Sequence, residues 1–409
     1  MRTDATIRCD VAVVGAGVVG AATALALARA GRDVVVVEPR APEAFVDGDG
    51  KDRDLRRSHD LRTYAISPAS AALLERLGAW QAVLAARACA YRTMRVWEND
   101  PSDELRFDAD LVGEGQLGWI VEDGLLRHVL WQRLLDSARA TLLTASVSTL
   151  ARDGDAALTL DDGRRVLAKL VVAADGAGSP LRRSAGLAAT TESYGERAIV
   201  ANVRTEAAHE YTAWQRFTRD GPLAFLPLTN GESSIVWSVK DATADALLAK
   251  DDDGFRAALG EAFQQRLGAV VSTSRRVALP LRLVLAPEYA GERFALVGDA
   301  AHAVHPLAGQ GLNLGLLDAS ALAECIGRDG DPGDAARLRE YARWRSADNM
   351  VAARSFDLLD GLFRSDVPGM GLLRRLGMGA VSRLTPLKRQ FALHAAGFAG
   401  RVPALSRRL

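Results

Sequence analysis

The sequence of 409 residues predicts an α/β fold that is interrupted by a mostly antiparallel β-sheet. Short β-branched runs at Val11–Val14 and Val34–Val37 flank an Ala/Leu-rich stretch, the pattern of a βαβ unit with buried parallel strands. Residues 190–285 contain instead two β-rich runs joined at Asn230-Gly231, which is a strong hairpin signal. The α/β pattern then returns with a short apolar strand and the apolar helix Leu312–Ile326. The α/β domain is therefore expected to be split by an inserted (α+β) sheet domain.

The two kinds of segment alternate along the chain, so each domain is expected to be assembled from separated pieces. Helices are expected near 67–77 and 124–139, and a buried strand is expected at 170–174. The expected α/β domain comprises 1–90, 119–189 and 286–345, the sheet domain comprises 91–118 and 190–285, and a helical region spans 346–409.

Composition excludes several classes of protein. The 51 basic and 51 acidic residues balance, so the chain lacks the basic footprint of a nucleic-acid binder. Three scattered cysteines give neither a disulfide framework nor a paired metal-ligand spacing, and they suit a reducing cytoplasm. The polar N-terminus does not have the pattern of a signal peptide, and no apolar stretch is long enough to cross a bilayer.

A glycine-rich turn, Gly15–Gly20, follows the first strand and opens the first helix. Gly15 allows the tight turn, Gly17 allows the backbone to approach phosphates, and Gly20 allows close packing of helix and strand. Glu38 ends the second strand, 18 residues after Gly20, where its carboxylate can accept hydrogen bonds from ribose hydroxyls. The pattern predicts a dinucleotide on a helix N-terminus, and the alternative is an ordinary tight turn.

A second GxGxxG match, Gly113–Gly118, is interpreted as a loop between strands. It follows no buried strand, and the strand-like Trp119–Val121 comes where a helix should start. A separate nicotinamide-binding domain is therefore not expected.

Two later segments favour a flavin over a nicotinamide. Asp299 follows an apolar strand, where a carboxylate can hold a ribityl chain, although an acid there can also cap a helix. The loop His305–Asn313 precedes a long helix, so its N–H groups can stabilise the negative charge of a reduced flavin. Asp175 is a third acid at a strand end, and its alternative reading is a plain connection. His302 and His305 give a thin case for a metal, because no third ligand completes a site, and a packed or pocket-lining histidine is the other interpretation.

Three motifs together resemble a known family: GAGVVG with Glu38, ADGAGSPLR around Asp175, and GDAAH…HPLAGQGLNLGLLD from Gly298 to Asp318. They are similar to the class A flavoprotein monooxygenases of the para-hydroxybenzoate hydroxylase fold. With Asp60-Leu61-Arg62 and Tyr64–Ser67, the last motif resembles the ubiquinone-biosynthesis hydroxylases over essentially the whole chain.

The resemblance implies a Rossmann-like FAD-binding domain and a set of cofactor contacts. These are Gly15, Gly17, Val18, Gly20, Glu38, Arg62, Arg127, Asp175, Asp299, Gly309, Gly311, Leu312 and Asn313. No catalytic side chain is assigned, and the candidates that face the flavin are His305, Pro306, Gly309 and Gln310. Asp123 departs from the family, which usually has Asn there, and the charged loop Asp47–Asp60 is long.

The resemblance also implies a reaction. NAD(P)H reduces the FAD, O2 reacts at C4a, and the flavin C4a-hydroperoxide passes one oxygen atom to an aromatic ring, here a prenylated phenol of ubiquinone biosynthesis. An apolar pocket is expected. Phe225, Leu226, Pro227 and Trp237 flank the hairpin and are its candidates, with core packing as the alternative for each.

Two other functions stay open at this point. One is a different FAD-dependent oxidoreductase, either a hydroxylase of another small aromatic compound or a dehydrogenase or reductase. The other is a non-catalytic FAD-binding subunit of a biosynthetic complex. The basic, leucine-containing tail Leu372–Leu409 can lie on a membrane or pack as a solvated helical surface, and a homo-oligomer is a further alternative.

Overall fold

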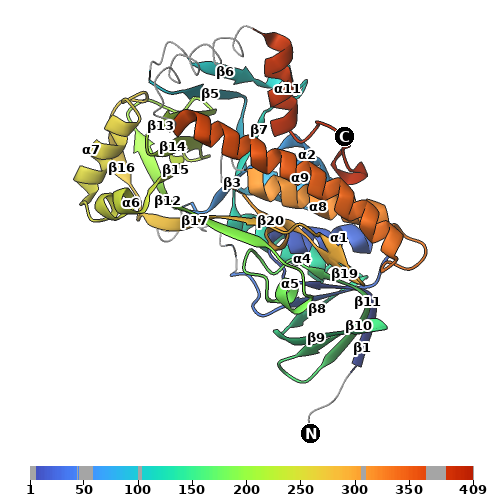
Figure 1. Ribbon diagram of the computed structural model, residues 1–409. Helices are drawn as coiled ribbons and strands as arrows, with labels where there is room; N and C mark the ends of the chain where they lie inside the picture. Colours follow the sequence, from blue (N-terminus) through green and yellow to red (C-terminus); the bar gives the residue numbers. More distant parts are fainter. Residues whose placement is uncertain are drawn as a thin grey trace.

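The computed structural model describes residues 6–43, 45, 59–99, 104–304, 310–364 and 384–408. It consists of two main sheets, each covered by helices, with a small sheet between them (Figure 1). The mixed α/β fold with a largely antiparallel second sheet confirms the predicted fold class.

The first sheet, called the parallel sheet here, has the order β18-β19-β11-β1-β2-β8. Val11–Val14 lie beside Val34–Val37 on one side and Leu170–Ala173 on the other, so the β-branched runs occupy its buried centre. The strands β9 and β10 continue it antiparallel beside β11. Its strands are β1 (Thr6–Val14), β2 (Val34–Glu38), β8 (Ala140–Thr144), β9 (Val147–Asp153), β10 (Asp155–Leu160), β11 (Arg165–Ala173), β18 (Ala290–Gly291) and β19 (Phe294–Leu296).

Helices cover the parallel sheet and bury its apolar side chains in one core. The first helix, α1, contacts α4 and α8, and α8 contacts α9. These helices are α1 (Val18–Arg29), α2 (Pro68–Arg76), α3 (Trp80–Ala86), α4 (Asp123–Leu135), α5 (Pro180–Ser184), α8 (Gln310–Ile326) and α9 (Ala335–Arg364). Because α9 is continuous, it runs across the boundary that was expected at residue 345.

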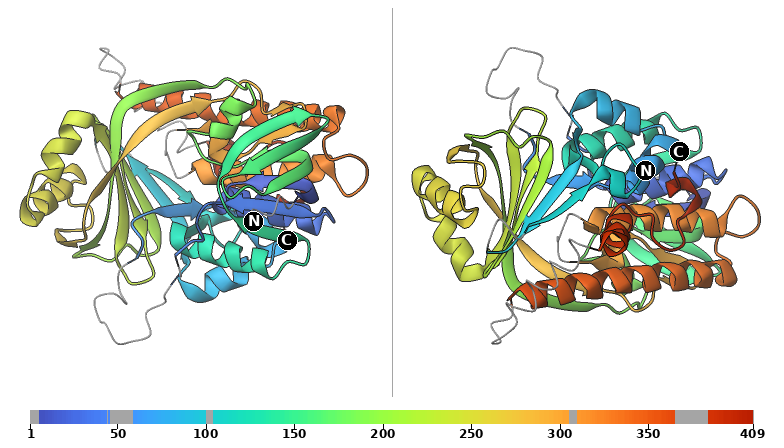
Figure 2. Two further views of the ribbon diagram at one scale, coloured as in Figure 1. Left: turned by 90° about the horizontal axis from the view of Figure 1, so that it is seen from below. Right: turned by 90° about the horizontal axis from the view of Figure 1, so that it is seen from above.

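The second sheet, called the antiparallel sheet here, has the order β20-β17-β12-β15-β14-β13-β5-β6, and β16 pairs with β12. One pair, β13 with β5, is parallel. Figure 2 shows long β12 and β17 reaching from the α/β domain into this sheet. Its strands are β5 (Thr93–Trp97), β6 (Leu105–Asp108), β12 (Thr190–Thr205), β13 (Thr212–Thr218), β14 (Gly221–Pro227), β15 (Ser233–Lys240), β16 (Val270–Thr273), β17 (Val277–Leu285) and β20 (His302–Ala303).

The hairpin between β14 and β15 turns at Gly231, whose φ of 81° suits glycine, as the Asn-Gly signal predicts. Two helices, α6 (Asp241–Leu248) and α7 (Asp252–Ala262), cover the outer face of the antiparallel sheet and form a second core with it.

A small sheet of β3 (Thr63–Ile66), β7 (Gly118–Glu122) and β4 (Cys89–Tyr91) completes the sheets. The second glycine motif lies in the loop between β6 and β7, as expected, because β7 begins at Gly118. Near the C-terminus, α11 (Thr385–Ala395) contacts the 3-10 helix η2 (Ala109–Leu111), and a further 3-10 helix, η5 (Ala404–Ser406), follows. Among the residues that the structure describes, no helix combines the length and hydropathy that a bilayer crossing demands.

Candidate active site

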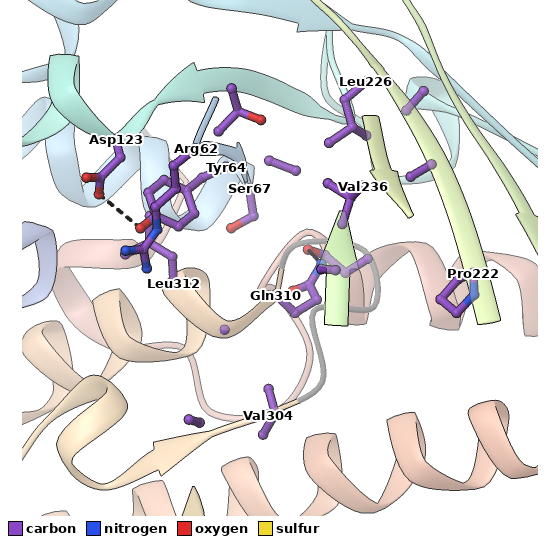
Figure 3. Close-up of a pocket in the computed structure, with 18 of the residues that line it drawn as sticks. Arg62, Tyr64, Ser67, Asp123, Pro222, Leu226, Val236, Val304, Gln310 and Leu312 are labelled. Atoms are coloured by element: carbon purple, nitrogen blue, oxygen red, sulfur yellow. Dashed lines mark hydrogen bonds between the residues drawn. The ribbon is translucent and has the colours of Figure 1, made fainter. Parts of the chain in front are cut away.

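A cavity of about 1020 Å³ lies between the α/β domain and the inner face of the antiparallel sheet. One side is formed by the glycine turn and by residues of the small sheet, and another by β12 to β15. Figure 3 shows Arg62, Tyr64 and Asp123 at one side of this space, and Pro222, Leu226 and Val236 on strands at the other. The cavity therefore joins the two domains.

The glycine turn has one closed side and one open side. A Cβ on Gly15, whose φ is 99°, would lie 2.4 Å from the carbonyl oxygen of Ala174, and a Cβ on Gly20 would lie 2.0 Å from that of Gly15. Both glycines are needed because the helix crosses the strand ends closely. A Cβ on Gly17 would meet nothing within 4 Å, and Gly17 and Val18 line the cavity.

This geometry fits a dinucleotide. Gly17 is the N-cap of α1, so the N–H groups that follow it lie at a helix N-terminus beside free space. Glu38, at the end of β2, accepts a hydrogen bond of 2.6 Å from the N–H of Ala16, which places its carboxylate against the turn.

Two arginines carry positive charge into the same part of the cavity. The guanidinium of Arg62 lies 5.4 Å from the ring centre of Tyr64, and Arg127 lies 3.9 Å from the carboxylate of Asp123. The Tyr64 hydroxyl donates a hydrogen bond of 3.0 Å to Asp123, and burial raises the pKa of Tyr64 so that it stays neutral (Figure 3). Asp123 thus contacts both Tyr64 and Arg127 at this side of the cavity. Sequence reasoning assigned no role to Tyr64.

Asp299 presents a carboxylate to the cavity. It lies in the short 3-10 helix η3 (Gly298–Ala300), whose N-cap is Val297, so Asp299 is not an N-cap. It forms no hydrogen bond with the described residues. Asp299 is exposed to the cavity, but the surrounding protein removes part of the water around its carboxylate and so raises its pKa, although electrostatic interactions with His302 and Arg62 act in the opposite direction. A free acceptor in this place suits the hydroxyl groups of a ribityl chain.

A buried network holds the turn that carries Asp299. Asp318, on α8, accepts hydrogen bonds from the N–H of Gly298 at 3.1 Å and from Nε2 of His302 at 2.6 Å. Its other oxygen accepts from Arg345 at 2.8 Å and from Asn349 at 3.0 Å, both on α9. Burial raises the pKa of Asp318, but the interactions with His302 and Arg345 outweigh burial and lower it. His302 is therefore a packed residue, and sequence reasoning missed its partner.

The loop that faces the expected flavin is only partly described. Gln310, Gly311 and Leu312 line the cavity, whereas His305, Pro306 and Gly309 lie outside the described residues. The side chain of Asn313 points elsewhere. It accepts from the N–H of Ser67 at 2.9 Å and donates to the carbonyl of Ala65 at 2.8 Å, which ties α8 to the small sheet.

Asp175 also has its side chain engaged in local structure. Its carboxylate accepts hydrogen bonds from Ser179 at 2.5 Å and from the N–H of Leu181 at 3.1 Å. The neighbouring Gly176 and Ala177 line the cavity through their backbone region. The turn, and not the carboxylate, is therefore the part that meets the cavity.

The hairpin candidates divide between the two faces of the antiparallel sheet. Phe225 and Trp237 lie in the outer core, where Phe225 stacks on Phe263 at 3.8 Å between ring centres. Leu226 on β14 and Val236 on β15 line the cavity. Pro227 is buried at the end of β14 and does not line it. Strict alternation along the strands is the signal that separates the two sets.

Within the described ranges, no cluster of three or more His, Cys, Asp or Glu side chains is arranged to hold a metal.

Comparison with known proteins identifies the family. The family described as FAD binding domain matches residues 8–354. The ubiquinone hydroxylase UbiL of Rhodospirillum rubrum is 40% identical over 95% of this chain and 89% of its own. The 3-demethoxyubiquinol 3-hydroxylase of Escherichia coli is 37% identical over 95% of this chain and 98% of its own.

Solved structures share the fold at lower identity. The p-nitrophenol 4-monooxygenase PnpA from Pseudomonas putida has a TM-score of 0.76 at 22% identity, over 97% of this chain and 99% of that one. HpxO of Klebsiella pneumoniae, complexed with FAD and uric acid, has a TM-score of 0.72 at 20% identity, over 96% and 98% of the two chains. The chain binds FAD and belongs to the ubiquinone-biosynthesis hydroxylases, a family of FAD-dependent monooxygenases.

Proposed function

We propose that this enzyme uses NAD(P)H and O2 to hydroxylate the aromatic ring of a prenylated phenol in ubiquinone biosynthesis. The names of the relatives at 40% and 37% identity support this substrate class. The observation that carries the proposal is a cavity that joins the glycine turn and Asp299 to the apolar inner face of the antiparallel sheet.

The residues of the chain bind and orient the cofactor. The N–H groups after Gly17, together with Arg62 and Arg127, suit the pyrophosphate, and Asp299 suits the ribityl hydroxyls. FAD, when bound, supplies the activation of O2 and the transfer of one oxygen atom. The chain's own contribution at the reacting end is exclusion of water by apolar side chains such as Leu226 and Val236.

We propose further that the nicotinamide reaches the flavin through the same cavity. The only strand–glycine-turn–helix of dinucleotide type in the described chain is the one at Gly15–Gly20. Gly176 adds an open stretch of wall, because a Cβ there would meet nothing within 4 Å. This arrangement suits an electron donor that binds transiently.

We also propose that the apolar rim of the cavity, Leu384, Leu387 and Phe391, rests on a lipid bilayer as a peripheral contact. These three side chains are exposed at or on α11, and Leu387 and Phe391 also line the cavity. Lys388 and Arg389 beside them suit anionic headgroups. A prenyl chain could then pass from the bilayer to the cavity without crossing water.

The test uses the FAD-loaded enzyme and 2-geranylphenol. The proposal predicts that the phenol accelerates NADH or NADPH oxidation several-fold and is converted to a product one oxygen atom heavier. Oxidation without such a product would support a dehydrogenase or reductase instead. Bound FAD that NAD(P)H and the phenol do not turn over would support a non-catalytic subunit.

A further inference from the structure

Two polar side chains interrupt an otherwise apolar wall of the cavity. On the four central strands β12 to β15, the other residues that line the cavity are apolar, such as Ala224, Leu226 and Val236. The exceptions are Gln215 on β13 and Ser238 on β15.

Neither side chain has its hydrogen-bonding capacity used by the protein. Ser238 is 1% exposed, and its Oγ has no hydrogen-bond partner among the residues that the structure describes. Gln215 is 6% exposed, and its amide forms no hydrogen bond with the described residues. Ala198, which is paired with Ser238 on β12, offers no side-chain acceptor. Burial of such groups without a partner costs free energy, so each is expected to meet a partner inside the cavity.

We propose that Ser238 and Gln215 form hydrogen bonds with ring oxygens of the aromatic substrate and so select and orient the ring. The inference rests on the proposed function, since it takes an oxygenated aromatic ring as the occupant. Gln215 lies opposite Ala224, which lies opposite Val236, two residues before Ser238. The anchors are therefore separated by about 10 Å across the sheet and about 7 Å along it.

This separation assigns the two anchors to different oxygens. Side chains that project from positions so far apart reach two separate oxygens more readily than one shared oxygen, and para-related oxygens on one ring can each meet one side chain. The serine hydroxyl and the glutamine amide can both donate and accept, so either a hydroxyl or an ether oxygen suits them. The apolar neighbours hold the ring and contribute no preference for oxygen.

The test measures binding to the FAD-loaded enzyme, without NAD(P)H and under nitrogen, by the change in flavin absorbance. The probes are 2-geranylhydroquinone, with two para oxygens, and geranylbenzene, with none. Ser238→Ala and Gln215→Leu should each weaken binding of the hydroquinone about fivefold to tenfold, the value of one neutral hydrogen bond, and leave geranylbenzene unchanged.

Ser320→Ala is the matched control. Ser320 is fully buried on α8, and its Oγ also lacks a partner among the described residues. It does not line the cavity, so both probes should bind as before. The proposal is overturned for a residue whose substitution weakens the binding of both probes equally, because that result indicates a packing role. It is also overturned for a residue whose substitution weakens the binding of neither probe, because that result indicates a water molecule as the partner. It is also overturned if the wild type binds the two probes equally or binds neither.

The design separates this inference from the proposed function. Binding is read without turnover, so the absence of hydroxylation would not alter the comparison of probes. Conversely, a Ser238→Ala variant that binds and hydroxylates a prenylated phenol as well as the wild type would overturn the role of Ser238 and leave the proposed function intact.

Discussion

Gly17→Ala is expected to separate FAD binding from folding. The backbone at Gly17 has φ −60° and ψ 176°, which alanine adopts readily, and the added Cβ would meet no protein atom within 4 Å. The loss of stability should be below about 1 kcal/mol, the cost of alanine at a helix N-cap. The same methyl group would occupy the space that the phosphates need. Overpacking costs about 1–3 kcal/mol, which corresponds to a rise of about 5- to 150-fold in the FAD dissociation constant.

Gly20→Ala is the contrasting variant, because its Cβ would lie 2.0 Å from the backbone oxygen of Gly15. Helix α1 would have to move away from β1, so the apoprotein itself should lose about 1–3 kcal/mol or more. Urea unfolding of the apoproteins and titration of FAD fluorescence measure the two effects. The reasoning is refuted if Gly17→Ala keeps the FAD affinity of the wild type, or if it destabilises the apoprotein as much as Gly20→Ala does.

Three further predictions concern single side chains. Asp299→Asn should weaken FAD binding about tenfold or more, since a charge-assisted hydrogen bond contributes about 1.5–3 kcal/mol. The pKa of Asp299 is raised, so its carboxylate should become protonated at a pH above the ordinary aspartate pKa. The affinity of the wild type for FAD should therefore begin to fall at that higher pH, and FAD titrations at a series of pH values measure this. Asp318→Asn should destabilise the fold by about 3–5 kcal/mol in urea, because it leaves Arg345 buried and poorly paired. The stability that ionised Asp318 contributes should be fully present above the ordinary aspartate pKa, and it should be lost as the pH falls from there through the lowered pKa of Asp318. Phe391→Asp should reduce co-sedimentation with anionic liposomes.

Each of these has a control and a result that contradicts it. Asp299→Asn should lack the acid-induced loss of affinity, and an unchanged pH profile would remove Asp299 from the FAD site. Asp348 pairs with Arg345 near the surface, so Asp348→Asn should lower the free energy of unfolding by about 1 kcal/mol or less. Equal losses for Asp348→Asn and Asp318→Asn would contradict the role given to the buried network. Leu135→Asp changes an exposed leucine on α4 and should leave liposome binding intact. Equal effects of Leu135→Asp and Phe391→Asp on liposome binding would contradict the proposed contact with a bilayer.

The fold class followed from local patterns because they are physically strong. Parallel strands that are buried on both faces must be apolar throughout, as Val11–Val14 and Val34–Val37 are. The Asn230-Gly231 pair supplied the backbone freedom that the hairpin needs. The domain boundary expected at residue 345 stays a prediction, and it falls inside the continuous helix α9, because helical periodicity does not reveal where one helix passes between two regions.

The site was less accessible to sequence reasoning. Apolar side chains lie on both faces of β14 and β15, so alternation alone does not say which face packs and which lines a cavity. The large Phe225 and Trp237 fill the outer core, whereas the smaller Ala224 and Val236 leave open space. The bonds of Asp318 to α9 join positions 27 and 31 residues apart, which no local pattern encodes.

The central claim is that one cavity brings FAD and an aromatic ring together for transfer of an oxygen atom from O2. The most direct measurement is the mass of the product that the FAD-loaded enzyme forms from 2-geranylphenol under 18O2 in ordinary water. The account predicts one 18O atom per molecule of product, and none when the label is supplied as H2 18O instead. A product that takes its oxygen from water, or that gains none, would contradict the account.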